Sequence, residues 1–268
     1  MIRQLTEADR GAVLAFLENE PEINVYIIGD IKNFGFDGPD TCVYAEFDAL
    51  GAYQAVLSRN LSHLVYYAIK PEFNLEWLPI IHQFEALFIS GKASVIEPLI
   101  PHFKNMEPDR LEFMKSTTFT PDTEIEEEDL KIVRTEADAE KVYALLNSIE
   151  ELESVRKKSR SEFIQYLLDN SGENGTTLYL ESANQVIASA SAVGETRRSA
   201  MIVGVATHPD YRNQGLGQVV LNRLVDLYVN KKNKTLCLYY DDPRAGHLYE
   251  KMGFVRIEDW VMLVKKNG

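Results

Sequence analysis

Residues 212–218, which read R-N-Q-G-L-G-Q, carry the strongest chemical signal in the sequence. An apolar run rich in β-branched residues, 200–206, precedes them, and an amphipathic stretch over 216–228 follows. The pattern predicts a buried strand, a tight turn and a helix. A helix N-terminus offers unpaired N–H groups and the positive end of the helix dipole. Glycines let an anion approach the backbone, and Arg212 adds a cation, so the chemistry indicated is phosphate binding.

The pattern Arg212-x-x-Gly215-x-Gly217 is more specific than two glycines with one residue between them. It fits the pattern Q/R-x-x-G-x-G/A and resembles the coenzyme A pyrophosphate loop of the GNAT superfamily of N-acetyltransferases. No Gly-Lys-Ser/Thr follows, so the loop is not a nucleotide P-loop, and Val220 stands where a dinucleotide motif has its third glycine. The alternative is that the two glycines only ease a strand-to-helix turn.

A second motif lies over residues 242–254, D-x-x-A-x-x-x-Y-x-K-x-G-F. It resembles the family's N-x-x-A-x-x-x-Y-x-K-x-G-F, in which the tyrosine lies near the coenzyme A sulfur and can protonate the departing thiolate. The resemblance assigns that catalytic role to Tyr249. The alternative is a core residue, because Tyr249 shares the apolar face of the helix predicted over 243–252. Asp242 replaces the family's asparagine and, when ionised, can only accept hydrogen bonds.

The resemblance implies that acetyl-CoA lies where two central parallel strands splay apart. Its pantetheine would contact the backbone around Val205, and its pyrophosphate would lie on the N–H groups of residues 213–218. No metal is implied. The residues expected to bind acetyl-CoA are Val205, Ala206, Thr207, Arg212, Asn213, Gln214, Gly215, Leu216, Gly217, Gln218 and Asp242.

The implied reaction is transfer of the acetyl group to a primary amine of a small molecule or peptide, by direct attack through a tetrahedral intermediate. An N–H group near Val205 would polarise the carbonyl. A neutral amine is the nucleophile, so a base or a water chain must take up a proton. The family often carries a glutamate on the strand before the loop, but residues 201–204 are M-I-V-G. The possible substitutes, each more typical of a solvated surface group, are Glu181, Glu195, Asp241 and His247.

Two readings from other functional classes stay open. One is a non-catalytic acyl-CoA-binding regulatory protein, and the other is an interaction protein with a vestigial glycine loop. Some glycine N-acyltransferase-like proteins also resemble this layout, and the sequence does not choose among amines.

The net charge and the apolar content of the chain limit the classes of partner that we expect. The chain has 268 residues and a net charge of −13, which argues against nucleic-acid binding and against an anionic membrane surface. It has no N-terminal apolar signal core and no run of eighteen apolar residues, so we expect a cytoplasmic protein. Cys42 and Cys237 lie in apolar strand-like segments, which predicts buried free thiols.

Two short matches indicate an internal repeat. Residues 6–9 and 135–138 both read T-E-A-D, and residues 67–73 align with 205–211. In the register of the second match, Trp77 corresponds to Gly215, and a proline corresponds to the second glycine. These side chains would fill the space that a pyrophosphate needs. We therefore predict tandem GNAT-like domains with a degenerate first copy that serves packing, substrate selection or homodimer formation.

The expected fold class is a mixed α/β fold with two GNAT-like domains in tandem, each a bent, mostly antiparallel sheet flanked by helices. The domains expected are 1–120 and 130–268, joined by an acidic linker at 121–129. Strands are predicted near 1–5, 41–47, 52–59, 62–69, 86–90, 110–115, 130–134, 176–181, 185–194, 199–207, 235–240 and 258–265. Helices are predicted near 6–18, 24–34, 74–84, 93–103, 136–149, 159–169, 215–230 and 243–252.

Overall fold

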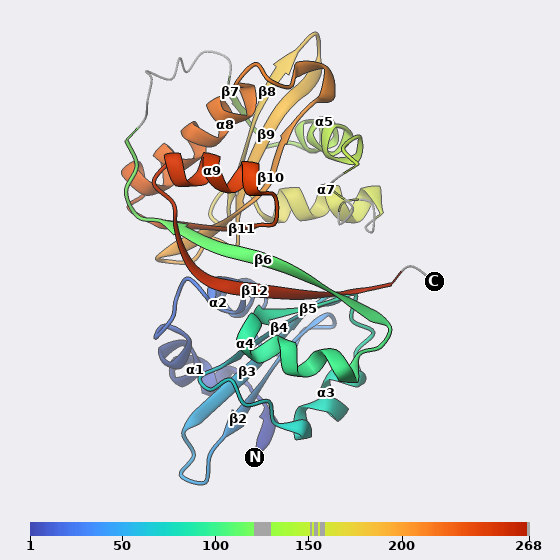
Figure 1. Ribbon diagram of the computed structural model, residues 1–268, viewed down its shortest axis with the longest axis vertical. Helices are drawn as coiled ribbons and strands as arrows, with labels where there is room; N and C mark the ends of the chain where they lie inside the picture. The colour runs from blue at the N-terminus through green and yellow to red at the C-terminus, as the bar shows by residue number, and fades with distance from the viewer. Residues whose placement is uncertain (121–129, 151, 153–154, 156–158, 267–268) are drawn as a thin grey trace. The chain divides into compact units, whose positions relative to one another are not determined.

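The structure is a computed structural model that describes all residues except 121–129, 151, 153–154, 156–158 and 267–268 (Figure 1). The expected linker at 121–129 lies outside the described residues. Contacts divide the chain into two compact units. The first unit comprises Met1–Met114, Tyr239–Gly246 and Arg256–Gly268, and the second comprises Lys115–Leu238 and His247–Val255.

The first unit is built from short helices and a sheet. Its strands are β1 (Ile2–Gln4), β2 (Thr41–Phe47), β3 (Tyr53–Asn60), β4 (His63–Ala68), β5 (Phe88–Lys92), most of β6 (Met106–Ser116) and nearly all of β12 (Val255–Lys265). Its helices are η1 (Glu7–Asp9), α1 (Arg10–Leu17), α2 (Val25–Phe34), η2 (Leu75–Trp77), α3 (Leu78–His82), α4 (Ala93–Ile96) and η3 (Glu97–His102).

The second unit begins, like the first, with a short strand, helical segments and then three consecutive strands. Its strands are β7 (Leu130–Ile132), β8 (Thr176–Ser182), β9 (Gln185–Val193), β10 (Ser199–Thr207) and the first part of β11 (Thr235–Tyr240). Its helices are α5 (Glu136–Asn147), α7 (Arg160–Asp169), η4 (Pro209–Tyr211), α8 (Leu216–Val225), the π-helix η5 (Asp226–Lys231) and the second half of α9 (Pro243–Lys251).

The last strand of the chain belongs to the sheet of the first unit. The strand order there is β1-β2-β3-β4-β5-β12-β6. Strand β4 is parallel to β5, and β12 is antiparallel to β5, with Val261 opposite Gly91. The domain boundary expected from the sequence groups this strand with residues 130–254, whereas its contacts group 256–268 with 1–114.

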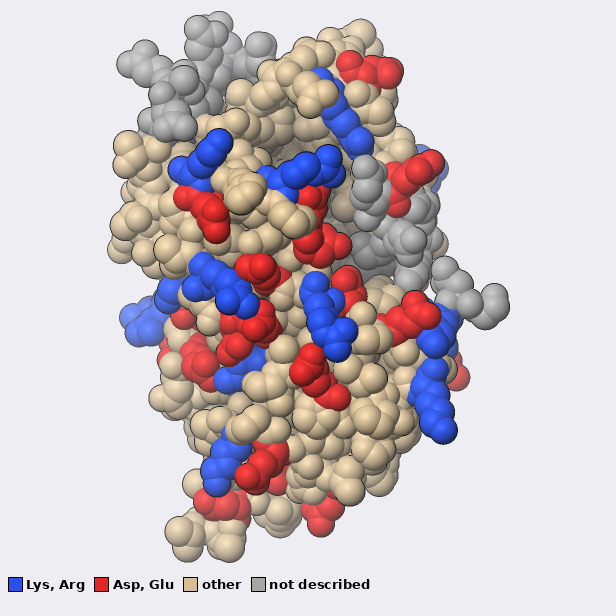
Figure 2. Space-filling view, in the orientation of Figure 1, with Lys and Arg blue, Asp and Glu red and all other residues tan. Residues whose placement is uncertain are grey.

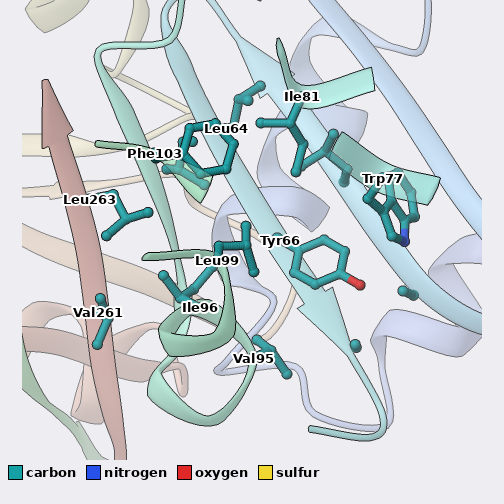
Figure 3. Packing of buried hydrophobic residues seen from close by; sticks show 14 of the residues in the cluster. Leu64, Tyr66, Trp77, Ile81, Val95, Ile96, Leu99, Phe103, Val261 and Leu263 are labelled. Carbon is teal, nitrogen blue, oxygen red and sulfur yellow. The ribbon is translucent and has the colours of Figure 1, made fainter. Parts of the chain in front are cut away.

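A cluster of buried apolar residues packs against the sheet of the first unit (Figure 3). Trp77 and Tyr66 are almost fully buried, and their rings meet edge to face with centroids 5.4 Å apart. Val261 and Leu263 of β12 are part of the same cluster. The C-terminal strand therefore supplies side chains as well as hydrogen bonds to this unit.

The second unit has the strand order β11-β10-β9-β8-β7, in which only β10 and β11 are parallel. Its core contains buried side chains of α5 and α7, among them Val142, Leu146 and Phe163, packed with Tyr179 and Val186 of the sheet. The expected fold class, mixed α/β with mostly antiparallel sheets flanked by helices, is confirmed.

The two T-E-A-D segments share the hydrogen bond from the threonine N–H to the aspartate carboxylate. The Thr6 N–H donates to the Asp9 carboxylate at 2.9 Å, and the Thr135 N–H donates to the Asp138 carboxylate at 3.0 Å. Both are capping boxes, in which a threonine and an acidic residue three positions later satisfy N–H groups at a helix start. The repeated letters thus begin a helical segment in both halves, the 3-10 helix η1 in the first and the α-helix α5 in the second.

Candidate active site

The site begins where two parallel strands part. Strands β10 and β11 pair from Ser199 to Met201, opposite Thr235 to Cys237. Strand β10 then continues to Thr207, still paired with β9 on its other side. The edge of β10 toward β11 is thereby open for an extended ligand over its last residues.

A bulge lies in this open part of β10. The register with β9 shifts between Val203 and Ala206, and Gly204 has a φ of +61°. A left-handed residue in a bulge is the conformation that glycine adopts without strain. Gly204 and Val205 are therefore not part of the regular ladder with β9, and Val205 is one of the residues that line the cavity described below.

The loop that follows has two residues in the left-handed region. Asn213 has a φ of +63°, and Gly215, the N-cap of α8, has a φ of +77°. The first helical hydrogen bond at this end runs from the Val219 N–H to the Gly215 carbonyl. The N–H groups of residues 216–218 thus have no acceptor within the helix, which is the arrangement by which a helix N-terminus can bind an anion.

The two glycines of the loop have different roles. A β-carbon at Gly215 would meet no atom within 4 Å, so the backbone there is open to a ligand. A β-carbon at Gly217 would lie 2.5 Å from the Thr207 Oγ1. Gly217 therefore permits α8 to begin directly against the end of β10, and Gly215 keeps the approach to the N–H groups clear.

A cavity of about 450 Å³ lies at this junction. Most of the residues expected to bind acetyl-CoA line it: Val205, Ala206, Thr207, Arg212, Asn213, Gly215, Leu216, Gly217 and Gln218. Gln214 and Asp242 are not among the lining residues. Arg212 is held at the mouth, where its Nε donates to the Thr207 carbonyl at 3.4 Å.

Four lining residues were not found by sequence reasoning. They are Ile149, Leu152, Tyr211 and Leu248. Tyr211 could have been included, because it lies in the same turn as Arg212. The apolar residues after α5 carry no local motif, so only the folded chain brings them to the cavity.

Asp242 caps α9. Its Oδ1 accepts a hydrogen bond from the Arg244 N–H at 2.8 Å, and its other oxygen pairs with the Arg244 guanidinium at 2.8 Å. Hydrogen bonds from the side chain and backbone of Arg244 hold the pKa of this carboxyl below its usual range. The N-cap predicted from the sequence is present, and the pantetheine contact of Asp242 stays a prediction.

Tyr249 is a buried residue of α9. Its ring packs against Phe254 with centroids 5.8 Å apart. Burial raises the pKa of its hydroxyl to about 12, so the phenol carries its proton at neutral pH. The neighbouring Leu248 lines the cavity and Tyr249 does not, so the thiol-facing role of Tyr249 stays a prediction.

Glu195, one of the four possible bases, is engaged in hydrogen bonds within the second unit. Its buried carboxylate accepts hydrogen bonds from Lys232 at 2.8 Å, Lys234 at 2.6 Å and the Tyr228 hydroxyl at 2.6 Å. Burial raises the pKa of Glu195, but these three hydrogen bonds outweigh it and hold the pKa below the ordinary value. The carboxylate ties the end of η5 to the turn before β10.

The other candidate bases lie outside the cavity lining or in the first unit. Glu181 accepts from Lys131 and Lys141, both at 2.9 Å, and these hydrogen bonds lower its pKa. His247 is 78% exposed at its side chain. Asp241 belongs to the first unit. The described lining residues include no carboxylate and no imidazole.

On the face drawn in Figure 2, Lys and Arg side chains are interspersed with Asp and Glu, without a continuous basic area among the described residues there. In the described part of the chain, no His, Cys, Asp or Glu side chains cluster as a metal site would require. None of the described helices combines the length and the apolar character that a membrane span needs. Cys42 and Cys237 are buried free thiols, as predicted.

Comparison with known proteins agrees with the site geometry. Residues 139–254 match the model of the acetyltransferase (GNAT) family. A protein described as uncharacterized N-acetyltransferase ycf52 from Gracilaria tenuistipitata var. liui is 27% identical over 99 residues, 37% of this chain and 54% of that protein. Its counterpart from Porphyra purpurea is 30% identical over 81 residues, 30% of this chain and 46% of that protein. The chain thus covers about half the length of these curated relatives.

Solved structures resemble the chain over its whole length. A Drosophila protein has a TM-score of 0.70 at 11% identity, covering 98% of both chains. A tandem GNAT protein from the clavulanic acid biosynthesis pathway has a TM-score of 0.57 at 9% identity, covering 100% of this chain and 99% of that one. At such low identity these likenesses concern the fold. The family match over 139–254 includes the loop at Gly215, so this part of the chain is similar in sequence to GNAT acetyltransferases.

Proposed function

We propose that the second unit binds acetyl-CoA and transfers its acetyl group to a primary amine of a small molecule or peptide. The observation that carries this proposal is the cavity between the open edge of β10 and the N-terminus of α8. Its floor offers free N–H groups, the left-handed Gly215 leaves them accessible, and Arg212 lies at the mouth. These are the features that a pyrophosphate needs.

The second unit also offers contacts for the pantetheine and the thioester of acetyl-CoA. The unpaired edge of β10 can bond an extended pantetheine, as one more strand would. Apolar side chains at Ile149, Leu152 and Leu248 form a wall for its methylene groups. At the bulge, the Val205 N–H would donate to the thioester carbonyl and stabilise the oxyanion that develops there.

Proton transfer completes the reaction. A primary amine must lose a proton before it attacks, and the described lining offers no carboxylate or imidazole to take it. We propose that water accepts this proton. Tyr249, protonated at neutral pH, would return a proton to the departing thiolate.

Isothermal titration of acetyl-CoA tests binding. We expect one site per chain. Arg212→Gln should raise the Kd about tenfold, since a charge-assisted hydrogen bond is lost. S-acetylpantetheine, which lacks the pyrophosphate, should bind both proteins equally. Arg160→Gln is the matched control, because Arg160 is exposed on α7 and pairs with Glu140. An unchanged Kd for Arg212→Gln would contradict the assigned loop.

We also propose that the first unit does not bind coenzyme A. Trp77, at the position that corresponds to Gly215, is fully buried and donates its indole N–H to the Glu46 carboxylate at 2.8 Å. The Asn74 amide, which corresponds to Arg212, donates to the same carboxylate at 2.9 Å. An internal anion thus already occupies these donors. In an NMR titration with acetyl-CoA, shifts should be confined to residues after 129, and saturable shifts around Trp77 would contradict this proposal.

A non-catalytic acyl-CoA-binding protein is the second candidate, favoured by the lack of a base among the described lining residues. Thiol release from acetyl-CoA in the presence of an amine panel separates the two. Binding without amine-dependent thiol release would support the second candidate.

A further inference from the structure

The first unit contains a cavity of its own, of about 270 Å³, that the proposed reaction does not use. It is lined by residues of β2, β3 and β4 and by the segment that follows β4. Glu46 and Tyr66 come from the strands, and Phe73 and Asn74 come from the segment. A cavity of this size is too small for coenzyme A and fits a small molecule.

The Glu46 carboxylate gives this cavity its charge. Each of its oxygens accepts one hydrogen bond, Oε1 from Asn74 and Oε2 from the Trp77 indole. A carboxylate has about four acceptor positions, so acceptor capacity remains on both oxygens. Both donors are neutral, and no ion pair to Glu46 occurs among the described residues. The half-buried negative charge thus has hydrogen bonds but no cation.

Tyr66 adds a second polar group to the same cavity. The residue is only 2% exposed, and its hydroxyl has no hydrogen-bond partner among the described residues. Figure 3 shows this hydroxyl pointing away from Leu99 and toward the side of the core where Trp77 lies. The hydroxyl oxygen is not one of the fully buried atoms without a partner, so it can be reached from the cavity that Tyr66 lines and can bond a ligand there.

The tyrosine is a neutral phenol at the pH of the cell. Burial, and then the nearby Glu46 carboxylate, raise the pKa of Tyr66 above its ordinary value. A protonated phenol donates one hydrogen bond and can also accept one. The ring of Tyr66 contacts Phe73 edge to face, with centroids 5.7 Å apart, so the cavity also has aromatic surface.

We propose that this cavity binds a small primary ammonium ion. Its N–H groups would donate to the Glu46 carboxylate and to the Tyr66 hydroxyl oxygen, and its alkyl part would lie against Phe73. Glu72 and Lys70, which also line the cavity, are both exposed, and their opposite charges balance. The net charge of the cavity lining is therefore the negative charge of Glu46. An anion would be repelled by Glu46, and a neutral alcohol would leave it without a counter-ion. This site is separate from the proposed acetyl-CoA site and does not depend on it.

The chain offers a direct reporter, because Trp77 and Trp260 are its two tryptophans. The Trp77 indole N–H is bonded to Glu46, whereas the Trp260 indole N–H is buried without a partner in the described residues. In an indole 15N–1H NMR spectrum of the full chain, n-propylammonium should shift the Trp77 signal saturably. The Trp260 signal serves as the internal reference. n-Propanol and propionate at equal ionic strength should leave both signals unchanged.

Two variants test the contacts. Tyr66→Phe removes only the hydroxyl. It should raise the Kd for n-propylammonium about tenfold, as the loss of one hydrogen bond to a charged group predicts. Tyr44→Phe is the control, because Tyr44 packs on the same core but does not line the cavity. Glu46→Gln should abolish binding, with the Trp77 signal retained as the sign of an intact fold.

Equal shifts with n-propanol, an unchanged affinity in Tyr66→Phe, or no saturable shift of Trp77 would overturn the proposal. Titration of the same sample with acetyl-CoA measures binding at the other proposed site independently. A protein that binds acetyl-CoA but not n-propylammonium overturns this inference alone, and the reverse overturns only the acetyl-CoA site.

Discussion

The start of α8 contacts the end of β10 so closely that a β-carbon on Gly217 would lie 2.5 Å from the Thr207 Oγ1. The Thr207 β-carbon lies farther away, at 3.9 Å from the same point. The hydroxyl of one threonine thus limits the residue at the helix terminus, and through it the position of the N–H groups on which the proposed pyrophosphate site depends.

Gly217→Ala should therefore displace the helix start. We expect a loss of about 1–3 kcal/mol of unfolding free energy, typical of overpacking, and an increase of about tenfold in the Kd for acetyl-CoA. The double variant Gly217→Ala with Thr207→Ala removes the clashing oxygen and should recover both. Calorimetric titration and thermal unfolding measure the two quantities. Gly11→Ala, where a β-carbon meets no atom within 4 Å, is the control. A double variant as weak as the single one would contradict this account.

Tyr249→Phe separates catalysis from packing. If the hydroxyl protonates the thiolate, turnover should fall about 100-fold while the Kd for acetyl-CoA stays the same. Because the pKa of Tyr249 is raised to about 12, the hydroxyl stays protonated as pH rises through 7 to 10, and no loss of activity from its ionisation is expected there. Steady-state kinetics across that range provide the measurement. Unchanged turnover with lowered stability would make Tyr249 a core residue.

Glu195→Gln should destabilise the second unit without taking part in the acetyl transfer. Removing the charge leaves Lys232 and Lys234 without their buried carboxylate, at a cost of about 3 kcal/mol near pH 7. The pKa of Glu195 is lower in the folded state, so its stabilisation is present above the unfolded pKa and is lost as pH falls through the folded pKa. The difference between wild type and variant, measured by denaturant unfolding, should thus shrink in acid.

Glu140→Gln provides the matched control, because Glu140 forms an exposed pair with Arg160. Such a pair contributes about 0–1 kcal/mol. A Glu195→Gln loss no larger than this, or one that grows as pH falls, would show that the carboxylate does not hold the η5 turn.

Leu263→Ala tests whether the last strand stabilises the first unit. Leu263 is 1% exposed in the core of that unit and lies opposite Ile89 of β5. We expect a loss of about 2–5 kcal/mol, with faster amide hydrogen exchange in β5. Leu50→Ala, at a position 94% exposed, should change neither. Exchange that accelerates only after residue 129 would contradict the placement of β12.

Local features of the fold were predictable from the sequence. The strand before the loop, the turn and the start of α8 follow from β-branched residues, a proline and two glycines within about twenty positions. The capping threonines Thr6 and Thr135 likewise act within four residues. Such features are decided by backbone sterics and short-range hydrogen bonds, which depend on residues that are neighbours in the chain.

The tertiary structure decided the rest. Nothing in residues 255–265 indicates that they pair with β5, because backbone hydrogen bonds between strands are the same for any partner. The apolar wall at Ile149 and Leu152 and the tethering of Glu195 by two lysines likewise depend on residues that are distant in sequence. The sequence alone determined which chemistry the loop at Gly215 favours. Only the folded chain decided which side chains surround that loop and which carboxylates are already engaged elsewhere, because both depend on long-range packing.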